Sequence, residues 1–187
     1  MEYPSILLIT YIETLANISG PSETIDWLKD IAETLFEKIE FIEFRDMEEF
    51  KENISEGKTF LPYFTNIPEI EDNLLLFKVC PFYETLWSYI EYYGRFPPSF
   101  EEIVEYYKER EDIAVSPFCI IHRFVCERIG EKIRIGNKRL FITRLGSKSV
   151  FGEIIISRKK IEEKKLNEED ILGLLKDFSC IYYLEAI

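Results

Sequence analysis

The segment 116–130, SPFCIIHRFVCERIG, holds the side chains best suited to metal binding or thiol chemistry. It contains Cys119, Cys126 and His122, and His122 is the only histidine among the 187 residues. Thiolate and imidazole groups are common zinc ligands, and a cysteine next to a histidine base is an arrangement used in nucleophilic catalysis. Three interpretations therefore compete: a metal site, a reactive thiol, or a buried helix that uses cysteine as a small hydrophobic residue.

The segment is predicted to form a helix that begins at Ser116 and Pro117 and ends at Gly130. At about 100° per residue, its two cysteines and its histidine fall on one narrow stripe. The expected core face lies next to this stripe and consists of Phe118, Ile121, Val125 and Ile129. We therefore expect the stripe to lie on the border between the core face and the polar face, where a ligand-facing cluster would also lie.

A metal site would need a ligand from outside this helix. Cys119 and Cys126 are separated by about 10 Å along the helix axis, whereas a Zn–S bond is only about 2.3 Å long. His122 with either cysteine is feasible if Cys80 and another group complete the site. The metal-ligand candidates are thus Cys80, Cys119, His122 and Cys126, with zinc as the metal, although the chain lacks a Cys-x-x-Cys knuckle.

The thiol interpretation centres on Cys119. This residue lies in the first helical turn, where the helix dipole lowers the pKa of a thiol, and His122 one turn later could act as its base. Glu127 is one of many acidic residues that could orient the histidine. In the third interpretation both cysteines are core residues, as is expected for Cys180 in the final strand.

A band of aromatic residues is the second distinctive feature of the sequence. Its members are Phe82, Tyr83, Trp87, Tyr89, Tyr92, Tyr93, Phe96, Phe100, Tyr106 and Tyr107. The band fits either an aromatic core with a subunit interface or the wall of an apolar ligand pocket with tyrosine hydroxyls as orienting donors. The predicted ligand-binding residues are Cys80, Trp87, Tyr89, Tyr93, Cys119 and His122.

The overall composition limits the class of partner. The net charge is −12, which disfavours binding to nucleic acid and to anionic membrane surfaces. No apolar run approaches the roughly 20 residues of a membrane span, and no basic region precedes the first apolar stretch as in a signal peptide. We expect a cytoplasmic protein with free thiols. Abundant Glu, Lys and Ile with only 8 Gly are typical of a thermophile.

The order of the predicted elements indicates an α+β protein. Helices are expected at 5–18, from Ser22, from Asp46, at 83–93, from Ser99 with Glu102 completing a capping box, and from Asn167. Strands are expected at 73–80, at 151–160 and at the C-terminus. Residues 132–145 are expected to form a hairpin or a connection into a strand, and residues 60–72 a loop or the approach to a hairpin. We predict one domain, 1–187, with N-terminal helices packed on an antiparallel sheet formed largely by the C-terminal half.

Several of these segments resemble a known family. ANISGPSETIDWLKDIAETLFEKI is followed by a strand ending in KVCPF, by FCIIHRFVCERIG, and by paired strands in KRLFITRLGSKSVFGEIII. This order is similar to the 4-vinyl reductase domain, a small-molecule-binding α+β family linked to hydrocarbons. In this comparison Cys80 and Cys119 correspond to the first two cysteine positions, and 83–112 is an aromatic helical insertion. The resemblance implies a ligand-sensing module, and relatives of the fold act as dimeric assembly subunits.

The sequence therefore predicts a cytoplasmic, sensor-like domain, as a homodimer, that binds a small apolar molecule in a mainly apolar pocket. Catalytic motifs such as GxGxxG, HExxH and GxSxG do not occur, so an enzyme is not favoured. One alternative is a zinc- or thiol-dependent protein that uses Cys80, Cys119 and His122. The other is a structural or adaptor subunit, which should present a flat aromatic patch in place of a cavity.

Overall fold

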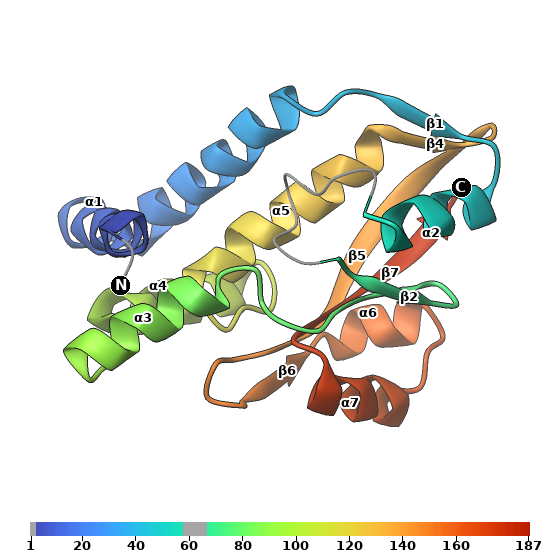
Figure 1. Cartoon of the computed structure of the whole chain (residues 1–187). Helices are drawn as coiled ribbons and strands as arrows, with labels where there is room; N and C mark the ends of the chain where they lie inside the picture. The colour runs from blue at the N-terminus through green and yellow to red at the C-terminus, as the bar shows by residue number, and fades with distance from the viewer. Residues whose placement is uncertain (1–2, 58–66) are drawn as a thin grey trace.

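The computed structural model describes residues 3–57 and 67–187 (Figure 1). The helices are α1 (Tyr3–Glu37), α2 (Met47–Ser55), α3 (Tyr83–Tyr93), α4 (Pro98–Arg110), α5 (Pro117–Glu131), α6 (Arg158–Glu163) and α7 (Glu168–Asp177). The strands are β1 (Ile42–Phe44), β2 (Glu69–Glu71), β3 (Leu74–Phe77), β4 (Ile133–Ile135), β5 (Lys138–Lys148), β6 (Ile154–Ile156) and β7 (Cys180–Ala186). The segment 60–72, predicted as a loop or the approach to a hairpin, lies partly outside the described residues, and its last part forms β2, which pairs with β3 in a hairpin.

Helix α1 consists of two helical segments, as the sequence predicts. Gly20 has φ 82° and ψ 174°, a conformation that L side chains rarely adopt, and Pro21 follows it as the start of the second segment. Figure 1 shows the resulting bend near the N-terminus. In the described part of the chain, no helix is both long and apolar enough to cross a membrane.

The strands form one sheet in the order β1-β4-β5-β7-β3-β2, with β6 paired to β5. All pairs are antiparallel except β1 with β4, which run parallel. The helices of the N-terminal half pack on a sheet whose longest strands come from the C-terminal half. The predicted α+β class is therefore confirmed, whereas the interpretation of 83–112 as an insertion stays a prediction.

The sheet is buried on both faces, because successive side chains of a strand point to opposite sides. In β3, Leu75 and Phe77 belong to the main core under the helices α1, α4 and α5, while Leu76 belongs to a second core under α6 and α7. In β7, Tyr182 and Ile181 divide between the two cores in the same way. The sheet is thus a middle layer.

A bulge in β5 changes which side chains face the main core. Arg144 pairs with Tyr182 and Gly146 pairs with Ile181, so Leu145 is the extra residue. Beyond the bulge Ser147 pairs with Cys180, and its hydroxyl contacts the Cys180 thiol at 3.8 Å. Because of this one extra residue, two polar side chains of β5, at 144 and 147, both face the helices.

Helix α5 is buried on two sides, between α1 and β5. Gly130 lies so close to β5 that a Cβ atom there would be 2.9 Å from the Leu140 carbonyl oxygen. The predicted border position of the cysteine and histidine stripe is therefore wrong: Cys119 and His122 are each 4% exposed and Cys126 is 0% exposed. A helical plot of one helix shows only one core face, whereas this helix packs against a sheet on one side and a helix on the other.

Two local predictions also differ from the structure. Helix α4 begins at Pro98, because its fixed φ suits the first helical position, so Ser99 lies inside the helix and does not cap it. The Ser99 hydroxyl is buried and has no hydrogen-bond partner among the described residues. The strand predicted at 151–160 is limited to β6, and Arg158 already begins α6.

The close approach of α5 and β5 gives a direct test of the packing. We expect Gly130→Ala to lower the free energy of unfolding by about 1–3 kcal/mol, because the new methyl group meets backbone atoms of β5 that cannot move freely. Gly173→Ala in α7 is the matched control, since apart from α7's own backbone and the neighbouring residues no atom of the described residues lies within 4 Å of the new methyl group. It should be neutral or stabilising by up to about 1 kcal/mol. Urea unfolding of both variants measures the difference, and equal effects would contradict the packing described here.

Candidate functional site

A cluster of buried polar side chains lies between α5 and the sheet, and Arg144 is its centre. Arg144 is 0% exposed. One of its terminal nitrogens donates to the Ile113 carbonyl at 3.1 Å and the other donates to the Cys119 carbonyl. Its guanidinium carbon lies 5.7 Å from the centroid of the Tyr182 ring. The buried cation is thus satisfied mainly by carbonyl groups and an aromatic face, and it ties the first turn of α5 to the sheet.

His122 links α5 to β7 within this cluster. Its Nδ1 lies 2.9 Å from the Tyr182 hydroxyl, and its Nε2 lies 3.7 Å from the Cys126 sulfur. The Phe77 ring packs edge-on against the imidazole. Burial, with a smaller effect of the Arg144 charge, lowers the pKa of His122 to about 3. The imidazole is therefore neutral at ordinary pH and is a weak base.

The cysteines around the cluster are free thiols. Burial raises the pKa of Cys126 far above its usual range and that of Cys180 to about 12. Burial also raises the pKa of Cys80, and the neighbouring Cys180 and Cys119 add to this effect. These three thiols stay protonated at neutral pH, whereas nucleophilic attack and metal binding both require the thiolate.

The structure does not assemble the predicted metal ligands. Over residues 3–57 and 67–187, no group of three or more His, Cys, Asp or Glu side chains has a geometry that could hold a metal ion. His122 faces Cys126 and Tyr182, while the Cys119 sulfur lies 3.7 Å from the Ser116 hydroxyl. Two of the candidates, His122 and Cys126, thus contact each other, but no third ligand is positioned with them among the described residues.

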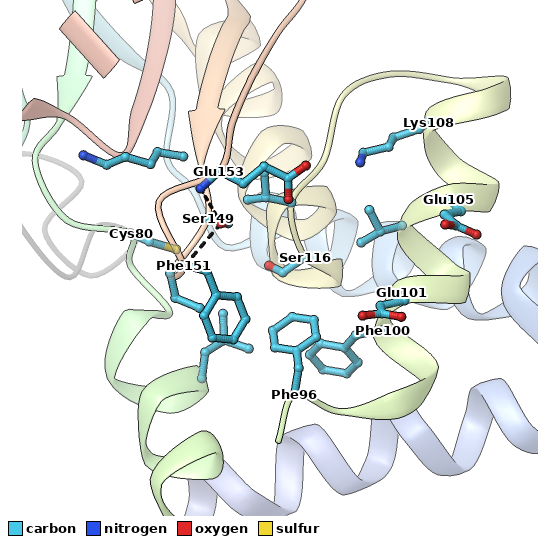
Figure 2. Close-up of a pocket in the computed structure, with 15 residues that line it drawn as sticks. Cys80, Phe96, Phe100, Glu101, Glu105, Lys108, Ser116, Ser149, Phe151 and Glu153 are labelled. Atoms are coloured by element: carbon cyan, nitrogen blue, oxygen red, sulfur yellow. Dashed lines mark hydrogen bonds between the residues drawn. The ribbon is translucent and has the colours of Figure 1, made fainter. Parts of the chain in front are cut away.

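A pocket of about 360 Å³ opens at the N-terminal end of α5. Figure 2 shows its lining, which comes from the β3–α3 connection, α3, the α3–α4 connection, α4, the residues just before α5, and the end of β5 with the β5–β6 loop. The apolar lining residues are Leu86, Phe96, Phe100, Val104, Val115, Val150 and Phe151. The polar lining residues are Cys80, Glu101, Glu105, Lys108, Ser116, Lys148, Ser149 and Glu153.

The β5–β6 loop has a defined shape that presents Phe151 to the pocket. The Ser149 hydroxyl accepts hydrogen bonds from the backbone N–H groups of Phe151 at 3.3 Å and Glu153 at 3.0 Å. The Gly152 N–H donates to the Ser149 carbonyl at 3.0 Å, and Gly152 has φ 85°. Serine therefore organises the turn, and glycine supplies the positive φ that closes it.

A chain of aromatic contacts leads from this loop into the core. Phe151, which is 64% exposed, lies edge-on to Phe96 with ring centroids 5.7 Å apart. Phe96 contacts Phe100 at 5.6 Å, and Phe100 contacts the fully buried Phe118 at 5.8 Å. The aromatic wall of the pocket is thus anchored on α5 and reaches solvent at the loop (Figure 2).

Ser116 provides a polar group in the buried part of the lining. It is the N-cap residue of α5, yet its side chain makes no capping hydrogen bond. The residue is only 2% exposed, and its hydroxyl contacts the Cys119 thiol at 3.7 Å. A thiol is a weak hydrogen-bond partner, so the hydroxyl keeps most of its capacity to bind a ligand.

The structure divides the residues predicted to bind a ligand. Cys80 lines the pocket, and Cys119 contacts the lining residue Ser116 without belonging to the lining itself. His122 lies deeper, in the polar cluster under α5. Of Cys80, Cys119 and His122, only Cys80 therefore faces the pocket.

The three aromatic residues predicted as the wall lie outside this lining. Trp87 stacks on Tyr83 at the surface of α3, and its indole N–H donates to Glu91 at 3.0 Å. Tyr89 packs toward α1, where its hydroxyl donates to Glu13 at 3.1 Å. Tyr93 is 46% exposed and packs against Tyr89.

Among the pocket residues missed by the prediction are Phe96, Phe100, Ser116, Ser149 and Phe151. Phe96 and Phe100 belong to the aromatic band and flank Pro97-Pro98, so a chain reversal at the prolines was a signal that they would face a common space. Phe151 stands in a Ser- and Gly-containing loop, where an aromatic residue is unusual. The side of the pocket formed by this loop depends on tertiary contacts that no local pattern reports.

Comparison with known proteins gives no relative: no family model matches the chain, and no curated protein or solved structure is significantly similar to it. The resemblance to the 4-vinyl reductase domain therefore stays a prediction.

The role of Arg144 can be tested by conservative replacement. We expect Arg144→Lys to lower the free energy of unfolding by about 2–4 kcal/mol, because one ammonium group cannot serve both buried carbonyls with the geometry of a guanidinium. Arg158→Lys is the matched control, since the Arg158 side chain is 79% exposed and pairs with Glu168 at the surface. It should change stability by less than about 0.5 kcal/mol. Urea unfolding at neutral pH measures both, and a neutral Arg144→Lys would contradict the assigned role.

The lowered pKa of His122 predicts a specific pH dependence. Between about pH 6.5 and pH 3 the unfolded chain binds a proton at this residue and the folded chain does not, so acid destabilises the fold. From pH 7.5 to pH 5 the contribution is about 2 kcal/mol. We expect His122→Gln to be less stable at pH 7.5 but to lose less stability on acidification. Arg144, Tyr182 and Cys126 do not titrate in this range, and parallel pH profiles of the two proteins would refute the assignment.

Proposed function

We propose that this chain binds a small, largely apolar molecule in the pocket at the N-terminal end of α5 and acts as a sensor-like binding domain. The observation that carries the proposal is the combination of an aromatic wall with one buried hydroxyl in a pocket of about 360 Å³. Binding sites for small molecules are typically concave and apolar, with a few polar groups that fix the orientation of the ligand.

The lining suggests how such a ligand would lie. An apolar body would pack between Phe151 and Phe96 on one side and Val104 on the other. A hydroxyl or carbonyl group of the ligand would reach Ser116, whose side chain does not cap its own helix. The charged lining residues 101, 105, 108 and 153 are all exposed, so they would meet solvent at the rim.

The thiol of Cys80 can report whether the pocket is occupied. It lines this pocket and also a neighbouring one on the other side of the β5–β6 loop. Its raised pKa makes it a poor nucleophile, so we assign it a contact role and no catalytic role. A bound ligand would shield this thiol, and alkylation of Cys80 should slow when the pocket is filled.

Binding of the neutral fluorescent probe N-phenyl-1-naphthylamine tests the proposal. We expect saturable binding to the unmodified protein, with affinity reduced roughly tenfold or more in Val104→Phe, because overpacking the pocket costs about 1–3 kcal/mol. Phe151→Ala should also weaken binding, since it removes an exposed ring of the wall without disturbing the core.

Two controls separate the pocket from other apolar surface. Phe141→Ala removes a comparably exposed ring from β5 outside the pocket, and Trp87→Leu changes the wall that the sequence alone predicted. Both should leave probe affinity within about twofold. No saturable binding, or equal losses in the controls and the pocket variants, would reject the proposed function.

The adaptor alternative keeps one supporting observation. The exposed aromatic side chains of α3 include Tyr92 at 69% and Tyr93 at 46%, whose ring centroids lie 4.9 Å apart. This surface fits the flat aromatic patch that a structural subunit would present.

The expected homodimer and the expected cytoplasmic location stay predictions. Sedimentation of the protein over a range of concentrations measures whether it forms a dimer.

A further inference from the structure

A groove of about 720 Å³ lies between the β2–β3 turn and α7, on the face of the sheet away from α5. Its lining differs in charge from that of the ligand pocket. The acidic lining residues are Glu71, Asp72, Glu169, Asp170 and Asp177, and the apolar ones are Leu74, Leu166, Ile171, Leu174 and Tyr183. The remaining members are Asn73, Asn167 and Gly173, so the part of the lining that the structure describes contains no Lys or Arg.

The acidic side chains of the groove are exposed and are not neutralised by the protein. Within residues 3–57 and 67–187, none of these five carboxylates takes part in an ion pair. Lys164 lies 5.5 Å from the centroid of the Tyr183 ring, but its ammonium group pairs with Glu185. The rim of the groove therefore has an excess of negative charge.

The requirements of the fold explain only part of this charge. Glu169 and Asp170 lie in the first turn of α7, where the helix dipole favours acidic residues. Asp177 is the last residue of the same helix, where the dipole disfavours a carboxylate. Glu71 and Asp72 belong to the β2–β3 hairpin, which needs no acidic residue at 71 for its register.

The distribution of the carboxylates argues for an extended cationic occupant. No group of three or more of them within the described ranges is close enough to hold a metal ion. They surround a floor of half-buried apolar residues, which includes Leu74, Leu166 and Leu174. A complementary molecule thus needs apolar groups at its centre and several separated positive charges at its edges.

We propose that this groove is a docking site for a basic, amphipathic segment of a partner protein, with Lys or Arg side chains on the rim and aliphatic side chains on the floor. The net charge of −12 would steer such a segment toward the chain, and the apolar floor would hold it in one place. The site is independent of the ligand pocket and does not depend on the function proposed for it.

Fluorescence anisotropy with two short labelled peptides tests the proposal on the full chain. One peptide combines lysine and leucine in an amphipathic pattern, and the other has glutamate in place of each lysine. We expect only the lysine peptide to bind. The triple variant Glu71→Gln, Asp72→Asn, Asp177→Asn should weaken its binding about tenfold, since each surface charge contributes a fraction of a kcal/mol. Leu174→Ala should weaken binding of the lysine peptide at both low and high salt. It removes apolar contact area from the floor of the groove, and salt does not screen apolar contacts as it screens charges.

The matched control removes the same number of charges elsewhere. Glu23→Gln, Asp30→Asn and Glu37→Gln change exposed carboxylates of α1, which lies across the molecule from α7 (Figure 1). This variant should change affinity by less than about twofold. Equal losses of peptide affinity in the two triple variants would mean that the peptide is attracted by net charge alone, and this would overturn the proposal. Binding of the glutamate peptide, or no binding of the lysine peptide, would overturn it as well. A concentration-dependent dimer that is lost only in the groove variant would identify a second copy of the chain as the occupant and would also overturn it.

Discussion

The guanidinium of Arg144 is the interaction on which the arrangement of this protein depends. It lies inside the molecule and donates to the carbonyl groups of Ile113 and Cys119, one before α5 and one in its first turn. A buried arginine cannot lose its proton, so these carbonyls must stay within reach of it. The start of α5 is thereby held against β5, and Ser116 between the two carbonyls is fixed where the pocket opens.

The same helix connects two regions with different physical character. At its N-terminal end α5 contributes Ser116 to a partly open pocket with an aromatic wall. About two and three turns later it contributes His122 and Cys126 to the closed cluster around Arg144, where burial keeps the imidazole neutral and the thiol protonated. The cysteines and histidine of α5 are therefore buried parts of the scaffold, and the pocket-lining residue Ser116 lies just before them in the chain.

Much of the fold follows from local patterns, but the pocket does not. The turn at Gly20-Pro21, the cap at Asn167 and helix 83–93 depend on residues close in sequence, and the structure confirms them. The burial of His122 depends on β5 covering the second side of α5, which a single helical plot cannot reveal. The pocket depends on the loop at 149–153 meeting α4, a helix about fifty residues earlier, and such contacts are set by tertiary packing.

The position of β7 in the sheet has a consequence for synthesis of the chain. β3 and β5 do not pair with each other directly; each pairs with β7, which follows both of them in the sequence. During translation β3 and β5 therefore leave the ribosome before β7, the strand that pairs with both. Their apolar side chains stay exposed until β7 is available. Long-range pairing of this kind slows folding and lengthens exposure to aggregation, so the nascent chain would gain most from chaperones just before β7 emerges.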